Sequence, residues 1–125
     1  MLSENGEEKI KQLFWGTGCQ KELSQFPEDV RDVMLQAFLI AQKGGKHPDA
    51  KPMKGFKGSG VVEVVESFEK NAYRAVYTTR IEESIHVLHV FQKKSKSGIS
   101  TPKSEIDLIK KRLKAVERQH AGGHS

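Results

Sequence analysis

The sequence predicts a small α+β domain: a twisted antiparallel sheet, made of a three-strand meander plus an N-terminal strand, with N-terminal helices on one face and a C-terminal helix. Two observations carry this prediction. Three consecutive segments rich in β-branched and aromatic residues, at 61–67, 72–79 and 84–92, have the length and composition of strands. Two longer segments, at 27–43 and 101–118, repeat apolar residues with the helical period.

The N-terminal part contributes the first strand and a short helix. Residues 9–15 alternate polar and apolar side chains up to Phe14, and Gly16 ends the run, which predicts an edge strand. Thr17 is followed three positions later by Gln20. Because this is the capping-box arrangement, we expect a short helix with Thr17 as its N-cap.

The segment 27–43 is the most regular helical pattern in the chain. A proline and two acidic residues suit the first turn, and the glycines at 44 and 45 suit its end. The side chains expected to face the core form one stripe: Val30, Val33, Met34, Ala37, Phe38 and Ala41.

Short polar connections join the three central strands, so an antiparallel meander is the simplest topology. The segment 45–60, rich in Gly, Pro and Lys, is expected to be a surface loop. Thr101 as cap and Pro102 in the first turn open the last helix. We expect one domain over residues 1–119 and a disordered tail at 120–125. The apolar stripe of the last helix is Ile106, Ile109, Leu113 and Val116.

Charge is distributed unevenly along the chain. The net charge is +5, but residues 1–50 carry 6 Lys/Arg against 8 Asp/Glu, whereas residues 51–125 carry 15 against 8. Clustered cations attract polyanions, so nucleic acid or an acidic protein is an expected partner, with a merely solvated basic surface as the alternative. The acidic start of the chain and the absence of a long apolar run predict a cytoplasmic protein with no membrane contact.

The glycine-rich stretch "PMKGFKGSG" carries two candidate anion-binding residues, Lys54 and Lys57. It precedes a strand and lacks the GK[ST] ending, so it is not a nucleotide-binding phosphate loop. Flexible ammonium groups on a turn can still reach a phosphate from several directions. The alternative is that both are ordinary surface lysines.

Glu63 shares a face of its expected strand with Val61 and Val65. A carboxylate on a half-buried sheet face needs a partner or takes a raised pKa. The expected partner is Arg74 on the adjacent strand; a raised pKa would suit a general base. Arg74 itself is either a bidentate phosphate clamp or only the ion-pair partner of Glu63.

The histidines and the cysteine give weaker signals. On a regular strand His86 and His89 point to opposite faces, so they cannot bind one metal ion together; each is expected to be a half-buried histidine with satisfied hydrogen bonds, with proton transfer as the alternative. Cys19, the single cysteine, is expected to serve in packing. The sequence predicts neither a metal site nor a cofactor.

Three segments together resemble a known family: "KPMKGFKGSGVVEV", "YRAVY" and "VLHVFQKKS…TPKSEIDLIKKR". The chain resembles the RelE/ParE superfamily of toxins from type II toxin–antitoxin systems and is similar to its HigB-like, phage-related branch. The resemblance implies a metal-independent endoribonuclease that cleaves ribosome-bound mRNA and inhibits translation. The alternative is a non-catalytic toxin that inhibits DNA gyrase by protein binding, or a phage relic that retains only antitoxin binding.

The resemblance also implies a helix-turn-helix antitoxin as partner, with operator DNA bound only through the antitoxin complex. Well-studied relatives have a tyrosine or histidine near the end of the last strand, where this chain has Phe91, Gln92, Lys93 and Lys94. The proton donor is then Lys94, with His89 or a C-terminal histidine as second choices. The implied catalytic residues are Glu63, Arg74 and Lys94, and the implied RNA-binding residues are Lys54, Lys57, Phe91, Lys93 and Lys96.

Overall fold

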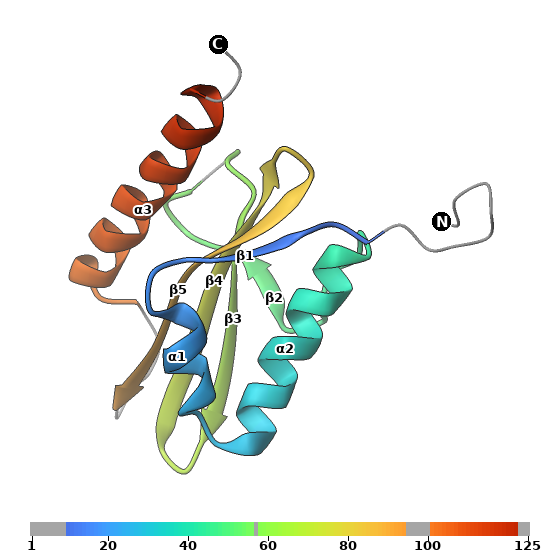
Figure 1. Cartoon of the computed structure of the whole chain (residues 1–125). Coiled ribbons are helices and arrows are strands. Elements are labelled where there is room, and N and C mark those ends of the chain that lie inside the picture. Colours follow the sequence, from blue (N-terminus) through green and yellow to red (C-terminus); the bar gives the residue numbers. More distant parts are fainter. Residues whose placement is uncertain (1–9, 57, 95–100, 123–125) are drawn as a thin grey trace, which may run out of the picture.

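The computed structural model describes residues 10–56, 58–94 and 101–122 (Figure 1). Within this part of the chain it shows three helices and five strands in one α+β unit. The elements are β1 (Leu13–Trp15), α1 (Cys19–Ser24), α2 (Glu28–Gln42), β2 (Ala50–Pro52), β3 (Val61–Phe68), β4 (Asn71–Ile81), β5 (Ser84–Lys94) and α3 (Lys103–Gly122).

The sheet is open and has the strand order β1-β5-β4-β3-β2. Strands β3, β4 and β5 form the expected antiparallel meander, and the predicted fold class is confirmed. Two details differ from expectation. β1 pairs with β5 in parallel, and a fifth strand, β2, pairs with β3 at the other edge. The three-residue β2 ends in Pro52, which an edge strand tolerates because one side of it needs no ladder hydrogen bonds.

Each face of the sheet is covered by different helices (Figure 1). On one face α1 and α2 pack with Tyr73, Tyr77 and Val87 into a core that includes Phe38 and Met34. On the other face α3 packs over a smaller core, with these buried members: Met53, Phe56, Val61, Val76, Ile81, Leu88, Phe91, Ile109 and Leu113. Cys19 is 2% exposed within the first core, which agrees with the packing role expected for it.

Helix boundaries follow the expected patterns with small differences. α1 begins at Cys19 after Gly18, which has φ 75° and no side-chain cap, so the expected capping by Thr17 is wrong. α3 continues to Gly122, so that residues 120–122 of the expected tail are helical; 123–125 lie outside the described residues. Within the described part of the chain, no helix is both long and apolar enough to cross a membrane.

A β-bulge in β5 changes which side chains face α3. Val76 of β4 pairs with His89, whereas the next residue, Tyr77, pairs with Val87, so Leu88 is an extra residue in β5. The expected alternation of His86 and His89 is therefore wrong. Both histidines lie on the face covered by α3, where His86 contacts His120 and His89 contacts Glu105.

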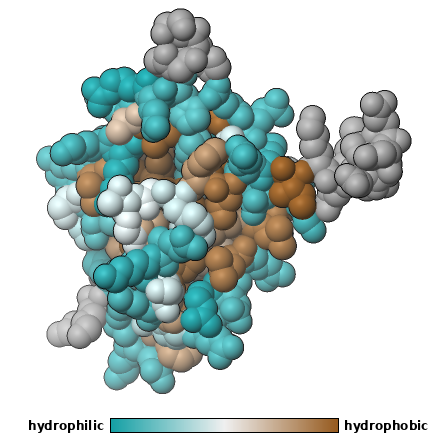
Figure 2. All heavy atoms as spheres, in the orientation of Figure 1, coloured by the Kyte–Doolittle hydropathy of each residue, from teal (hydrophilic) through white to brown (hydrophobic). Residues whose placement is uncertain are grey.

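Some large apolar side chains remain exposed on the surface. Figure 2 shows them gathered around β1 and α2. The large hydrophobic residues exposed there are Ile10, Phe14, Leu35 and Leu39. Single exposed apolar side chains are common on folded proteins, so this surface is not by itself a site.

Candidate active site

Glu63 of β3 and Arg74 of β4 form the centre of the candidate site. Arg74 pairs in register with Val65, two residues beyond Glu63, so the two side chains are diagonal neighbours on the face covered by α3. Arg74 Nη1 lies 2.9 Å from Glu63 Oε2. The predicted cross-strand ion pair is therefore confirmed.

Thr101, just before α3, completes this group. Its hydroxyl donates a hydrogen bond of 2.8 Å to Glu63 Oε2 and accepts one of 3.3 Å from Arg74 Nη1. Thr101, expected to cap α3, thus uses its side-chain oxygen to join the start of the helix to the sheet. The first backbone hydrogen bonds of α3 are accepted by the carbonyl of Pro102. We call Glu63, Arg74 and Thr101 the sheet cluster.

The sheet cluster is largely enclosed. The Arg74 side chain is 3% exposed and the Glu63 side chain is 18% exposed. Burying a cation this far is costly unless a carboxylate compensates it, and Glu63 provides that compensation. The exposed Lys51 of β2 lies directly opposite Glu63 in register, which adds a cation to the same face. Sequence reasoning missed Lys51 because the three-residue β2 has no recognisable strand pattern.

His89, brought to this face by the bulge, lies in a second polar group. Its Nε2 is 3.0 Å from Glu105 Oε1, and Arg112 Nη1 is 3.1 Å from its Nδ1. Because an arginine can only donate, Nδ1 accepts and the ring proton lies on Nε2, directed at Glu105. Both ring nitrogens of His89 are thus engaged by residues of α3, and these contacts join β5 to the helix.

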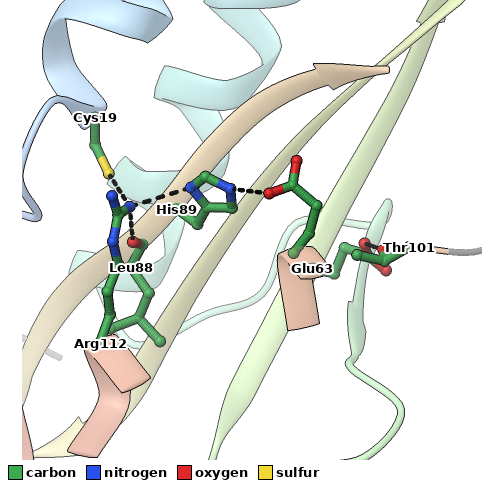
Figure 3. A network of polar contacts seen from close by, with 7 residues as sticks. Cys19, Glu63, Leu88, His89, Thr101 and Arg112 are labelled. Atoms are coloured by element: carbon green, nitrogen blue, oxygen red, sulfur yellow. Dashed lines mark hydrogen bonds and ion pairs between the residues drawn. The ribbon is translucent and has the colours of Figure 1, made fainter. Parts of the chain in front are cut away.

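Arg112 of α3 holds this second group together. Figure 3 shows its side chain between Cys19 and His89. Its Nη1 donates a hydrogen bond of 2.8 Å to the carbonyl of Leu88, the extra residue of the bulge. The same nitrogen lies 3.9 Å from Cys19 Sγ. Burial raises the pKa of the Cys19 thiol, and the guanidinium opposes that rise. Sequence reasoning missed Arg112 and Glu105, since nothing in a solvated helical pattern indicates their distant partners.

The end of β5 carries the other expected site residues. Phe91 is 6% exposed, and its ring stacks on His89 at 4.6 Å, while Lys93 pairs in register with Ala72. The backbone of Lys94 lies at the last position of β5. Lys54 is exposed in the turn after Met53, and Lys57 and Lys96 lie outside the described residues.

Two other titratable groups lie away from the sheet cluster. His86 is 6% exposed between the rings of Phe14 and His120, and burial together with His120 lowers its pKa against the opposing effect of Glu82. His120 in turn contacts the Glu82 carboxylate. These contacts tie the C-terminal half of α3 to the β4–β5 turn.

Glu66 lies on the other face of β3. Burial and a hydrogen bond with Asp49 raise the pKa of Glu66 to about 7. In the described part of the chain, no three His, Cys, Asp or Glu residues are grouped closely enough to hold a metal ion.

Comparison with protein families adds one finding. Residues 21–114, about three quarters of the chain, match the family described as phage-derived protein Gp49-like (DUF891). The chain belongs to the Gp49-like family. This family is associated with toxins of the RelE/ParE-like type from toxin–antitoxin systems. No curated protein and no solved structure matches the chain.

Proposed function

We propose that this Gp49-like protein is a HigB-like toxin of a type II toxin–antitoxin system, acting as a metal-independent endoribonuclease on ribosome-bound mRNA and thereby inhibiting translation. The family finding supports a toxin with an antitoxin partner. The observation that carries the enzymatic part is the sheet cluster: a carboxylate and a guanidinium on one face, 2.9 Å apart, beside a strand end with two lysines. The antitoxin we propose is a helix-turn-helix protein, operator DNA is bound only through that complex, and the site of action is the cytoplasm.

The chemistry that we propose uses the RNA itself as nucleophile. The 2′-hydroxyl attacks the adjacent phosphorus and gives its proton to the Glu63 carboxylate, acting as general base. Arg74 stabilises the extra negative charge of the phosphorane, with a phosphate oxygen replacing the Thr101 hydroxyl as its acceptor. The P–O5′ bond breaks, and O5′ takes a proton from Lys94. The products are a 2′,3′-cyclic phosphate and a 5′-hydroxyl.

The proposed RNA contacts are the residues implied by the family resemblance. Lys54 and Lys93 belong to the described part of the chain, and Lys57 and Lys96, which lie outside it, complete the proposed basic set. Phe91, enclosed against His89, supports the floor of the site and would contact a base only at its exposed edge. These cations supply electrostatic attraction to the phosphate backbone.

A second candidate function has one observation in its favour. Arg74 is nearly fully enclosed and compensated by Glu63, as in a purely structural ion pair, and both ring nitrogens of His89 are engaged by Glu105 and Arg112. A toxin that inhibits DNA gyrase by protein binding needs neither a base nor an acid. In such a toxin the sheet cluster only fastens α3 to the sheet.

Primer extension on a message translated in the presence of the purified protein separates the two functions. New 5′ ends inside codons, absent with Glu63→Gln, support the ribonuclease. Removing a general base is expected to slow cleavage by about 10²–10⁴-fold. An intact message together with accumulated gyrase–DNA breaks would instead establish the gyrase inhibitor. Glu69→Gln, an exposed carboxylate in the β3–β4 turn, is the matched control.

A further inference from the structure

A groove of about 550 Å³ lies between the turn that precedes β3 and the side of α3. Figure 1 shows this turn beside α3. Gly55, Phe56 and Ser59 form one wall, and α3 residues from Asp107 to Glu117 form the other. A groove of this volume can accept a group of nucleotide size.

The interior of the groove is apolar and its rim is basic. Phe56 and Leu113, which are 7% and 8% exposed, belong to the core below it. Lys110, Lys111 and Lys114 are exposed along its α3 side. Figure 2 shows hydrophilic side chains along the outer side of α3.

Three lysines and two carboxylates line the groove, and none of the lysines is held in an ion pair among the described residues. Asp107 and Glu117 are within one helical turn of them, yet the ion pairs within 4.0 Å found among the described residues include none of the three. Lys110 Nζ instead lies 6.0 Å from the centre of the Phe56 ring, at the outer limit of a cation–π contact, so its ammonium stands over the groove. Adjacent like charges repel one another, and a bound anion would relieve that repulsion.

We propose that this groove binds the sugar–phosphate backbone of RNA next to the cleavage position. The inference rests on the proposed function and extends it to residues outside the sheet cluster. From Lys103 at the start of α3 to Lys110 the helix rises about 10 Å. That length corresponds to about three stacked nucleotides at ~3.4 Å each. A strand whose scissile phosphate lies at Arg74 therefore reaches the groove with nucleotides flanking the cut.

RNA fits the groove better than an acidic protein segment does. A nucleotide joins a flat apolar surface to an anion, which matches the apolar interior and the lysine rim. Lysines supply no fixed pattern of donors for reading base edges, so the binding is independent of sequence. Lys54, in the same turn immediately before Gly55, is a further exposed cation beside the groove.

The test measures binding of the full-length protein to a single-stranded 2′-O-methyl RNA 12-mer, which has no 2′-hydroxyl and cannot be cleaved. The variant is Lys110→Gln/Lys111→Gln/Lys114→Gln, titrated at several salt concentrations. Removing three phosphate contacts is expected to reduce the slope of log affinity against log salt by about 2, because each contact to a single strand contributes ~0.7. The matched control is Lys21→Gln/Lys43→Gln/Lys46→Gln, on α1 and after α2, which has the same net charge.

The outcomes separate this inference from the proposed function. A reduced slope in the groove variant, with the control like wild type, supports the groove. Equal slopes in groove variant and control overturn it, whether or not the wild type cleaves mRNA. If the groove variant has a reduced slope but the wild type leaves translated mRNA intact, the groove is still an RNA-binding site and the proposed ribonuclease activity is refuted. Loss of binding to an acidic peptide but not to RNA assigns the groove to a protein partner and refutes the inference.

Discussion

The two faces of the sheet are held by different kinds of contact. The face covered by α1 and α2 is closed by apolar and aromatic packing, with Phe38 in edge contact with both Trp15 and Tyr77. The face covered by α3 combines a smaller core with polar groups that join the helix to the sheet at Thr101, Glu105 and Arg112. The first face is held by apolar packing, and the second combines less packing with charged and polar groups that fasten α3 to the sheet.

Truncation in the apolar face has the largest expected effect. Phe38 is 1% exposed, and Phe38→Ala is expected to lower the free energy of unfolding by about 3–5 kcal/mol. Urea denaturation measures this. The folded fraction should keep the activity that we propose, since Phe38 is on the face away from the sheet cluster. Leu35→Ala, 41% exposed on the same helix, is the control and should change stability little.

The sheet cluster offers the sharpest contrast with that packing. Glu63→Leu leaves Arg74 buried without its carboxylate and is expected to cost roughly 3 kcal/mol. The double variant Glu63→Leu/Arg74→Met should be more stable than the single one, because no buried charge remains. A double-mutant cycle by chemical denaturation measures the coupling between the two side chains. Additive effects would show that the pair contributes no specific interaction.

Arg112 tests whether polar contacts hold α3 in place. Arg112→Met removes the hydrogen bonds to the Leu88 carbonyl and to His89, with an expected cost of about 2 kcal/mol. Hydrogen exchange should increase first in α3 and at the bulge in β5. Arg118→Met, an exposed arginine of the same helix, should stay within about 0.5 kcal/mol of wild type. Equal losses in both variants would contradict the assigned role of Arg112.

Glu66 gives the smallest effect, which depends on pH. Its pKa is raised from an ordinary value near 4.5 to about 7, so between these pH values the folded state binds more protons than the unfolded state. The contribution of Glu66 to the free energy of unfolding therefore falls as pH rises through this window. Glu66→Gln removes this dependence, and its stability relative to wild type should increase from pH 5 to pH 8. Thermal unfolding across that range checks it; a constant difference would show that Glu66 titrates normally.

The elements with strong periodicity were predictable, and the contacts that build the site mostly were not. The α2 stripe and the meander follow from residue spacing, and the Glu63–Arg74 pair follows from neighbouring strands on a common face. Thr101 reaches Glu63 across 38 residues of sequence, a distance over which local patterns carry no information. Three-residue strands such as β1 and β2 are too short to reveal whether they run parallel or antiparallel.

Tight turns show the same limit. Glu69 and Lys70 join β3 to β4, and Glu82 and Glu83 join β4 to β5, all with positive φ. Such two-residue hairpins favour Asn and Gly, because other residues adopt this backbone at a cost. The sequence therefore predicted both connections as turns, but no residue in them indicated the positive φ angles that they adopt.

The extra residue in β5 has a consequence for any comparison made by counting along the strand. Up to Val87, even-numbered positions face α3; from His89 onward, odd-numbered positions do. The alternation shifts by one residue at Leu88. Two residues on either side of Leu88 whose sequence numbers differ by an odd number, such as His86 and His89, can therefore face the same side of the sheet. Strict alternation through Leu88, with no bulge, would instead turn every side chain from His89 to Lys94 to the wrong side. The geometry of the site thus depends on chain length at one position as much as on residue identity.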